Sequence, residues 1–326
     1  MHCLTMCSPI TLRDYINENK PLILDGGLAT QLEAQGFELG GEALWSARLL
    51  HTNPEAIKDV HYRFLLSGSD VITTATYQAS VEGFIQHLGV TCEHAKELLM
   101  SGVHLAKHTL QKYMSENKTG EIKGLVAGSI GPYGAFLHDG SEYTGDYAKE
   151  MSIESLKSWH RPQVECLTAA GADIIAFETI PSIKEAEALV QLLREFPNTE
   201  AWLSFSCKDV KCISDGSLFP DVVQVALKCP QVVAVGVNCC APDLVEPLLD
   251  SVQTLLNPDL SWVVYPNSGE EWDTDKGWLA QEKKVGSLSQ FCESWRSHGA
   301  AFIGGCCRIG PAQITELRRV LKGPIE

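Results

Sequence analysis

The stretch GADIIAFET, residues 171–179, holds the pattern that decides the fold. A glycine that can end a helix is followed by an almost unbroken apolar run, and the run closes on an acid, Glu178, and a threonine. A short run of this kind is typical of a strand buried on both faces of a parallel sheet. Residues 68–72 (GSDVI) and 299–303 (GAAFI) repeat the same order, so one strand-and-helix unit recurs along the chain.

Eight stretches of the sequence have this strand pattern, and helical signals lie between them. Asn53-Pro54-Glu55 and Pro181-Ser182 each place a capping side chain beside a proline, which predicts a helix start, and Gly68 is expected to end the first of these helices. The predicted strands are Pro21–Gly27, Asp70–Tyr77, Gly124–Gly131, Asp173–Ile180, Glu200–Cys207, Val232–Cys239, Ser261–Asn267 and Ala300–Cys307.

Eight strands with helices between them predict an α/β fold of the (β/α)8 TIM-barrel type, which takes about 250 residues plus insertions. The alternative is a doubly wound open sheet, but no Gly-x-Gly-x-x-Gly turn follows the first strand, where a dinucleotide-binding fold carries it. No low-complexity linker divides the 326 residues. We therefore expect one barrel domain over residues 1–326, with a short N-terminal extension at residues 1–12.

Composition narrows the class of partner. Hydrophobic residues make up 44% of the chain, and 26 Lys and Arg against 41 Asp and Glu give a net charge of −15. Such a charge repels nucleic acids and anionic membrane surfaces, so neither is an expected partner. The N-terminal residues lack the pattern of a secretory signal, and the uncharged run Cys229–Pro242 is too short to span a bilayer. We expect a cytoplasmic protein whose twelve cysteines stay reduced.

Two of the eight predicted strand ends carry paired cysteines, Cys239-Cys240 and Cys306-Cys307. Chemistry in a barrel of this type lies at the carboxyl ends of the strands, and strands six and eight are close enough for their loops to reach one ion. Three thiolates with a fourth position left open for substrate describe a catalytic zinc site. A vicinal redox pair is the alternative that the residues leave open.

The spacing of these cysteines sets a geometric condition. Consecutive side chains on a regular strand point to opposite faces, so Cys306 and Cys307 can share a metal only where the strand is broken, and Gly304-Gly305 permits this. Cys240 is the expected spare, because Cys239 directly follows the strand-ending Asn238. The other cysteines show no metal-ligand spacing and are interpreted as structural or incidental: Cys3, Cys7, Cys92, Cys166, Cys207, Cys212, Cys229 and Cys292.

At this point the sequence resembles a known family. Asp25-Gly26-Gly27, the Gly-Val-Asn-Cys that ends at Cys239 and the Gly-Gly-Cys-Cys that ends at Cys307 resemble the homocysteine S-methyltransferases, a family of zinc-dependent barrels. The resemblance covers nearly the whole chain, and the two cysteine motifs together are its most specific part. Further matching stretches are 128–134 (GSIGPYG), 140–145 (GSEYTG), 177–179 (FET) and 265–270 (YPNSGE).

The resemblance implies that zinc is held by Cys239, Cys306 and Cys307 and that the zinc-bound homocysteine thiolate takes a methyl group from a sulfonium donor to give methionine. Within the family the chain is most similar to the enzymes that use S-methylmethionine and, less well, S-adenosylmethionine. Gln78 stands where the betaine-dependent members carry a tyrosine. A betaine-dependent enzyme remains one alternative, and a vicinal-thiol redox or metal-binding protein without methyl transfer remains another.

Homocysteine also carries an ammonium and a carboxylate. Asp25 and Glu178, acids at the ends of the first and fourth predicted strands, are the expected partners of the ammonium, as the resemblance also implies. Backbone amides at Gly26 and Gly27 and the hydroxyl of Thr74 or Thr76 are candidates for the carboxylate. For the cationic donor the candidates are the aromatic faces of Trp45, Tyr133 and Tyr143, with Glu142 and Glu270 adding negative potential.

Overall fold

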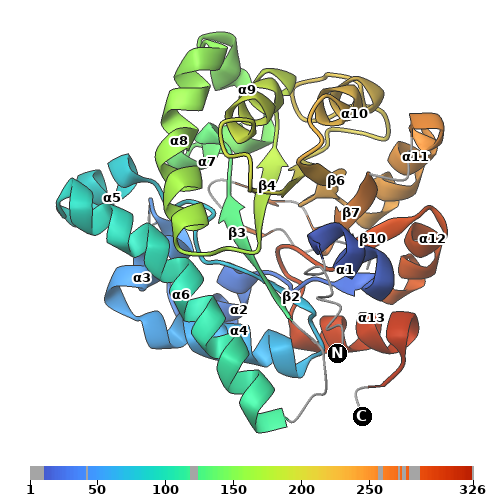
Figure 1. Cartoon of the computed structure of the whole chain (residues 1–326), viewed down its shortest axis with the longest axis horizontal. Coiled ribbons are helices and arrows are strands. Elements are labelled where there is room, and N and C mark those ends of the chain that lie inside the picture. The colour runs from blue at the N-terminus through green and yellow to red at the C-terminus, as the bar shows by residue number, and fades with distance from the viewer. Residues whose placement is uncertain are drawn as a thin grey trace, which may run out of the picture.

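Eight parallel strands form the centre of the computed structural model, which describes residues 11–41, 43–117, 124–255, 260–270, 272–273, 277–278 and 287–324 (Figure 1). Their order in the sheet is β1-β10-β7-β6-β5-β4-β3-β2. A parallel bridge between Leu24 and Val71 joins the two outer strands, so the sheet closes into the predicted (β/α)8 barrel. The strands are β1 Leu22–Ile23, β2 Val71–Thr73, β3 Leu125–Ile130, β4 Ile174–Ile180, β5 Ala201–Phe205, β6 Val232–Asn238, β7 Ser261–Tyr265 and β10 Ala300–Ile303.

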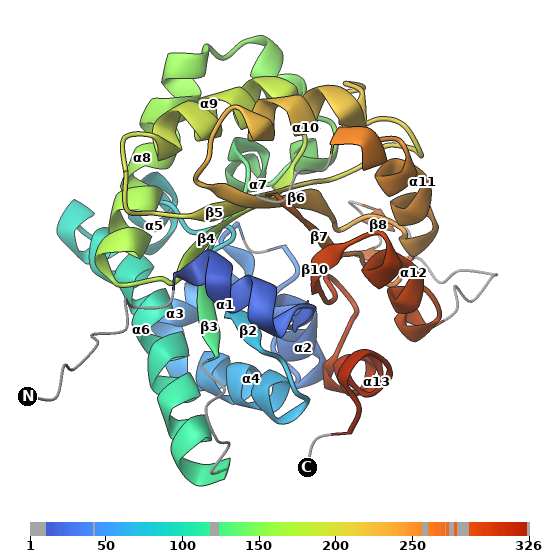
Figure 2. The ribbon, with the colours of Figure 1, turned by 45° about the vertical axis from the view of Figure 1, so that its right-hand side comes forward.

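Helices surround the barrel (Figures 1 and 2). They are α1 Leu12–Asn19, α2 Leu28–Ala34, α3 Leu49–Thr52, α4 Pro54–Leu66, α5 Val81–Leu88, α6 Cys92–Asn117, α7 Tyr133–Leu137, α8 Ile153–Ala169, α9 Ile183–Leu193, α10 Phe219–Leu227, α11 Val245–Asp250, α12 Cys292–Ser297 and α13 Pro311–Lys322. A small antiparallel hairpin, β8 Trp272–Asp273 and β9 Gly277–Trp278, follows β7. In the described part of the chain, none of these helices is long and apolar enough to cross a membrane.

The alternation of side chains explains why the strands read as continuous apolar runs. In β4, Ile174 and Ala176 point into the barrel interior, whereas Ile175 and Phe177 pack under the helices. Trp202 of β5 fills the interior, with its ring centroid 5.5 Å from that of Phe302. Both faces of each strand are therefore buried, and a polar residue is expected only where a strand ends.

The repeated Gly-x-Asp order has a structural cause. Asp70 precedes β2 and uses its carboxylate to accept a hydrogen bond from the amide of Ile23 on the neighbouring strand β1, at 2.8 Å. Asp173 precedes β4 and accepts from the amide of Val126 on β3, at 2.7 Å. Each aspartate thus fixes the start of one strand against the strand before it. The 299–303 repeat has alanine at this position and no such bond.

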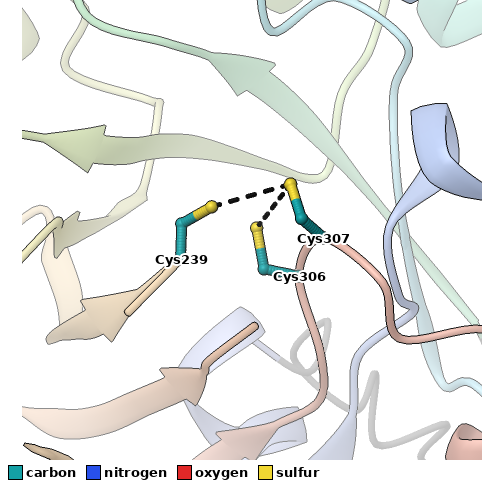
Figure 3. A group of neighbouring side chains, drawn as sticks. All are labelled: Cys239, Cys306 and Cys307. Atoms are coloured by element: carbon teal, nitrogen blue, oxygen red, sulfur yellow. Dashed lines mark hydrogen bonds between the residues drawn. The ribbon is translucent and has the colours of Figure 1, made fainter. Parts of the chain in front are cut away.

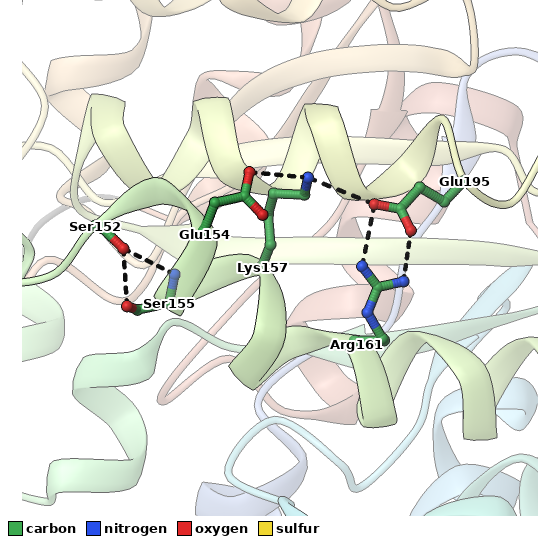
Figure 4. A network of polar contacts seen from close by, with 6 residues as sticks. All are labelled: Ser152, Glu154, Ser155, Lys157, Arg161 and Glu195. Atoms are coloured by element: carbon green, nitrogen blue, oxygen red, sulfur yellow. Dashed lines mark hydrogen bonds and ion pairs between the residues drawn. The ribbon is translucent and has the colours of Figure 1, made fainter.

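The predicted helix signals are confirmed. The side chain of Asn53 accepts from the amide of Ala56 at the start of α4, and Gly68, just beyond its end, has a left-handed φ of +91°. Ser182 caps α9 through the amide of Lys184. On the outer surface α8 and the end of α9 are joined by ion pairs, in which Glu195 accepts from both Arg161 and Lys157 (Figure 4).

Three regular strands end well before their predicted carboxyl ends: β1 at Ile23, β2 at Thr73 and β10 at Ile303. The next residue of each still donates to a neighbouring strand, Leu24 to Ile303, Thr74 to Ala127 and Gly304 to Val264, so the pairing continues for one residue beyond the regular strand. Residues 1–10 of the predicted extension and Cys3 and Cys7 lie outside the described residues, while Leu12 already belongs to α1. Ile16 of that helix packs with the first residues of several strands. The helix α1 therefore covers the amino end of the barrel, opposite the strand ends that carry the polar residues (Figure 2).

Candidate active site and metal centre

Three cysteine sulfurs converge at the carboxyl end of the barrel. The sulfur of Cys307 lies 3.7 Å from that of Cys239 and 4.0 Å from that of Cys306, and all three lie within 4.8 Å of one another. Figure 3 shows Cys239 at the end of β6 pointing toward the pair that follows β10. Within the described residues this is the one cluster of three or more His, Cys, Asp or Glu side chains with metal-binding geometry. The predicted trio is therefore brought together.

The break that Cys306 and Cys307 require is present. β10 ends at Ile303, and the amides of the next three residues bond alternately to two neighbours: Gly304 and Cys306 to the β7 side, and Gly305 to the carbonyl of Asp25. A Cβ at Gly304 would come within 2.5 Å of Leu24, and one at Gly305 within 2.2 Å of Ile309. Glycine is thus needed at both positions, because the chain passes close to the end of β1 at Gly304 and close to its own following turn at Gly305.

Cys239 is held by the end of β6. Its φ is +51°, an uncommon value for a residue with a side chain, and its amide bonds to the carbonyl of Tyr265 at 3.2 Å. The preceding Asn238 is fully buried and exchanges two hydrogen bonds with Thr179, the residue after Glu178. The strand end that carries the cysteine is therefore fixed to the strand end that carries the acid.

The three sulfurs fit a metal ion. Four-coordinate zinc with Zn–S bonds of about 2.3 Å places its sulfur ligands about 3.8 Å apart, close to the separations of 3.7 and 4.0 Å between these cysteines. Hydrogen bonds from Cys306 and Cys307 lower the pKa of Cys239 well below its usual value, and the same hydrogen bonds to Cys239 raise the pKa of the other two. One thiolate is thus stabilised by the cluster itself, and three require a cation among them. Cys240, the expected spare, points into the apolar layer under the helices.

Asp25 and Glu178 are the two predicted acids, and both are almost fully buried, at 3% and 8% exposed. Asp25 accepts from the amide of Thr73 at 2.7 Å and from its hydroxyl at 2.5 Å. Glu178 accepts from the hydroxyl of Ser129. Burial raises the pKa of each carboxyl to about 7, and the charge of Asp25 adds to the effect at Glu178. In the described ranges neither acid forms an ion pair with a basic side chain.

The other predicted substrate contacts are already engaged within the protein. Thr74 accepts from the amide of Ser129 at 2.9 Å and shares a hydrogen bond with Thr76, which donates to the carbonyl of Ser129. The amide of Gly27 bonds to the carbonyl of Ile309, and a Cβ at Gly26 would come within 2.1 Å of that carbonyl oxygen. The glycine pair thus lets the end of β1 pack against the turn that carries Cys306 and Cys307.

The aromatic and acidic candidates divide into two groups. Tyr143 lies at the site, with its hydroxyl 3.5 Å from the sulfur of Cys239. Tyr133 instead packs against Trp159 and Tyr147 in the layer of helices. Glu270 is paired with Arg308 at 2.6 Å, so its charge is already balanced. Glu142 has no such partner among the described side chains, and burial raises its pKa to about 7.

The comparisons with known proteins agree with this geometry. The family model described as homocysteine S-methyltransferase matches residues 22–321. The chain belongs to the homocysteine S-methyltransferase family. It is therefore a methyltransferase that acts on homocysteine and a methyl donor, as the sequence predicted.

Relatives in this family are similar over almost their whole length. The homocysteine S-methyltransferase of Escherichia coli is 43% identical over 309 residues, which cover 94% of this chain and 97% of that one. The crystal structure of the E. coli homocysteine methyltransferase MmuM in its metallated form superposes with a TM-score of 0.83 at 41% identity, covering 94% and 98% of the two chains. A betaine-homocysteine S-methyltransferase of Drosophila melanogaster is 40% identical over 94% of this chain and 96% of its own. A relative named for betaine is thus nearly as similar as relatives whose names state no donor, so identity alone does not choose the donor.

Sequence reasoning missed the groups that hold the acids of this homocysteine S-methyltransferase. Thr73 binds Asp25, Ser129 binds Glu178, and Tyr265 hydrogen-bonds Ser204 at 2.6 Å and also contacts Glu178. Thr73 and Ser129 lie on strands next to those of their partners, whereas Tyr265 on β7 reaches across to Ser204 on β5 and Glu178 on β4. These residues could have been found from the sequence as polar residues inside otherwise apolar strands.

Proposed function

We propose that the protein is a zinc-dependent enzyme that transfers a methyl group from S-methylmethionine, and less well from S-adenosylmethionine, to homocysteine. The observation that carries this proposal is the convergence of three thiols beside two buried acids that have no ion-pair partner among the described residues. Such acids favour a bound cation, and homocysteine brings an ammonium. The all-sulfur donor set favours a soft metal such as zinc over magnesium or calcium.

Cys239, Cys306 and Cys307 would hold the zinc ion. When bound, zinc would supply a Lewis acid that keeps a thiol substrate deprotonated at neutral pH. Asn238 and the glycines at 304 and 305 keep the three sulfurs on one side, so little rearrangement is needed when the metal binds. A rigid support of this kind raises metal affinity.

Asp25 and Glu178 would bind the substrate ammonium from two sides. Thr73 and Ser129 already orient these carboxylates, so the amino acid is held with its side chain toward the cysteines. We propose Gly26, Gly27 and Thr74 as neighbours of the carboxylate. To bind the substrate, the Gly27 amide would give up its hydrogen bond to Ile309 and the Thr74 hydroxyl its hydrogen bond to Thr76.

The transfer itself is a displacement at carbon. The homocysteine sulfur forms a bond to the methyl carbon, the bond between that carbon and the donor's sulfonium sulfur breaks, and its electron pair stays on the donor sulfur. With S-methylmethionine both products are methionine, and the thiol proton of homocysteine is released to solvent. No side chain has to move a proton during methyl transfer, so the protein contributes by alignment and electrostatics.

The donor assignment is tested by incubating the protein with homocysteine and one of four donors: S-methylmethionine, S-adenosylmethionine, betaine or methyl-folate. We expect methionine to form fastest with S-methylmethionine. Strong turnover of betaine with none of S-methylmethionine would show that the donor is wrong. Absence of turnover with every donor would favour the alternative of a vicinal-thiol protein without methyl transfer.

The zinc assignment is tested with Cys306→Ala and, as a matched control, Cys240→Ala. The first variant removes one of the three converging sulfurs, whereas the second removes the neighbouring cysteine that points away from them. We expect the purified protein to hold about one zinc, lost with activity in Cys306→Ala and kept in Cys240→Ala. Full methyl transfer by Cys306→Ala would contradict the zinc-thiolate site.

The ten described cysteines are all free thiols, which agrees with a cytoplasmic location, and we propose that location.

A further inference from the structure

Glu142 lies in the short helix η2 (Ser141–Tyr143), between α7 and α8, and is held next to the cysteine cluster. Its carbonyl accepts from the hydroxyl of Ser206, at the end of β5, at 3.1 Å. Its amide lies so close to Gly134 that a Cβ there would come within 2.6 Å. The next residue, Tyr143, contacts the sulfur of Cys239. The backbone of Glu142 is thus fixed beside the metal-binding cysteines.

The carboxylate of Glu142 is incompletely bonded. Its Oε2 atom is buried and has no hydrogen-bond partner within the described residues. The same holds for Oε1 of Gln78, whose amide nitrogen donates to the carbonyl of Ala135, next to Gly134. Two buried acceptors without donors therefore lie on neighbouring segments. Buried polar atoms are paired in most proteins, so unpaired ones at a ligand site point to a ligand that donates.

The chemistry of these atoms limits the ligand. Both are oxygens that accept hydrogen bonds, and one belongs to a carboxylate, so together they suit a cation that carries N–H groups. A quaternary ammonium such as betaine has no N–H to offer, and a sulfonium has none either. The α-ammonium of an amino acid has three. Asp25 and Glu178 lie at strand ends and are the proposed partners of homocysteine, which leaves Glu142, outside the ring of strands, for the second substrate.

We propose that Glu142, assisted by Gln78, binds the α-ammonium of the methyl donor and so selects sulfonium compounds that are also amino acids. This inference rests on the proposed function and adds to it the chemical class of the donor. It also assigns a reason for excluding betaine, since a donor without N–H leaves these buried acceptors unpaired.

The first test uses two donors on the unaltered, zinc-loaded protein. S-methylmethionine is compared with 4-(dimethylsulfonio)butanoate, which has the same chain and sulfonium but hydrogen in place of the amino group. We expect kcat/KM for the compound without the amino group to be at least about tenfold lower, because a hydrogen bond to a charged group is lost. Equal kcat/KM for the two donors would overturn the inference.

The second test repeats this comparison with Glu142→Gln and with the control Glu150→Gln, an exposed acid near the same loop. In Glu142→Gln we expect KM for S-methylmethionine to rise about tenfold or more, with zinc content and KM for homocysteine unchanged, and no further loss for the donor without the amino group. Glu150→Gln should behave as the unaltered protein. An unchanged KM for S-methylmethionine, or an equal loss for both donors, would overturn the inference.

The two levels of proposal fail differently. If the unaltered protein transfers no methyl group from either sulfonium compound, the proposed function and the inference both fall. If the unaltered protein does transfer the methyl group of S-methylmethionine, but Glu142→Gln has the same KM for that donor, the inference alone falls.

Discussion

The hydroxyl of Tyr143 lies 3.5 Å from the sulfur of Cys239, although the two residues come from different elements, the helix η2 and the end of β6. A phenol hydroxyl in this position can donate to a thiolate and stabilise its charge. The contact links the segment between α7 and α8 directly to the cysteine cluster.

Tyr143→Phe should therefore weaken metal binding without removing a ligand. Loss of a group that bonds to a metal ligand lowers metal affinity by about 10- to 100-fold, and we expect the low end of that range. Competition with a coloured chelator measures the affinity. Tyr133→Phe in the same segment is the control, because its ring packs against Trp159 and not against the cysteines. Equal affinities of the two variants would contradict the assigned contact.

Substitution of the buried acids should weaken homocysteine binding selectively. In Asp25→Asn or Glu178→Gln the ammonium loses a charged partner, and we expect KM for homocysteine to rise by about tenfold or more. Zinc content should stay the same, since neither carboxylate belongs to the sulfur cluster. Asp221→Asn, which replaces an exposed acid in the first turn of α10, serves as the control. Unchanged homocysteine affinity in both variants would show that the ammonium binds elsewhere.

The raised pKa of these acids predicts how ligand binding depends on pH. Asp25 and Glu178 have pKa values of about 7 in the free protein, so below pH 7 they are largely protonated and neutral. A bound ammonium favours the ionised form, so binding releases protons, and affinity rises with pH up to about 7 and is level above it. Methionine is the suitable probe because it has no thiol proton. Calorimetry in buffers of different ionisation enthalpy measures the release, and proton uptake would contradict the model.

Glu185 should stabilise the segment that carries Glu142 and Tyr143. Its carboxylate is fully buried and accepts from the amide of Tyr133, the hydroxyl of Tyr147 and the ring of His160, and so holds both ends of that segment. Glu185→Gln should lower the free energy of unfolding by about 2–3 kcal/mol.

The matched control is Glu195→Gln, which breaks the ion pairs between α8 and the end of α9 that face solvent (Figure 4). Exposed pairs contribute less than about 1 kcal/mol, so this variant should unfold near the urea concentration of the unaltered protein. If both variants were equally stable, Glu185 would have no anchoring role. Both measurements use metal-free protein, because bound metal adds its own stabilisation.

His61 predicts an acid-sensitive step in stability. Its ring is fully buried in α4 without a hydrogen-bond partner in the described chain, and burial lowers its pKa to about 4. The unfolded chain takes up this proton near pH 6.5, whereas the folded protein resists it until about pH 4. The free energy of unfolding should thus fall as pH falls from 6.5 to 4, by up to about 3 kcal/mol from this group. In His61→Leu that part of the decline should disappear from urea titrations. If the free energy of unfolding of His61→Leu fell as steeply below pH 6.5 as that of the unaltered protein, this account would be contradicted.

The barrel could be predicted from sequence because each strand is buried on both faces, so that runs such as residues 174–180 are apolar almost throughout. The cysteine trio could be predicted because strand ends meet at one end of a barrel. The contact of Tyr143 with Cys239 could not, since η2 belongs to an irregular connection whose path depends on tertiary packing. The contacts of Thr73 with Asp25 and of Ser129 with Glu178 could not be predicted for a related reason. A hydroxyl inside a strand has several possible partners, and the register between neighbouring strands determines which of them it meets.

The division of the cysteines between β6 and β10 also sets the order in which the protein matures. β7 lies between these strands in the sheet, so Cys239 meets Cys306 and Cys307 only after β7 and β10 have docked. Small zinc modules fold around their ion and are unfolded without it. For the proposed zinc site we instead expect the ion to bind a scaffold that is already folded. A chain synthesised under zinc starvation should accumulate as a folded, inactive reserve, and added zinc should activate it without a refolding step.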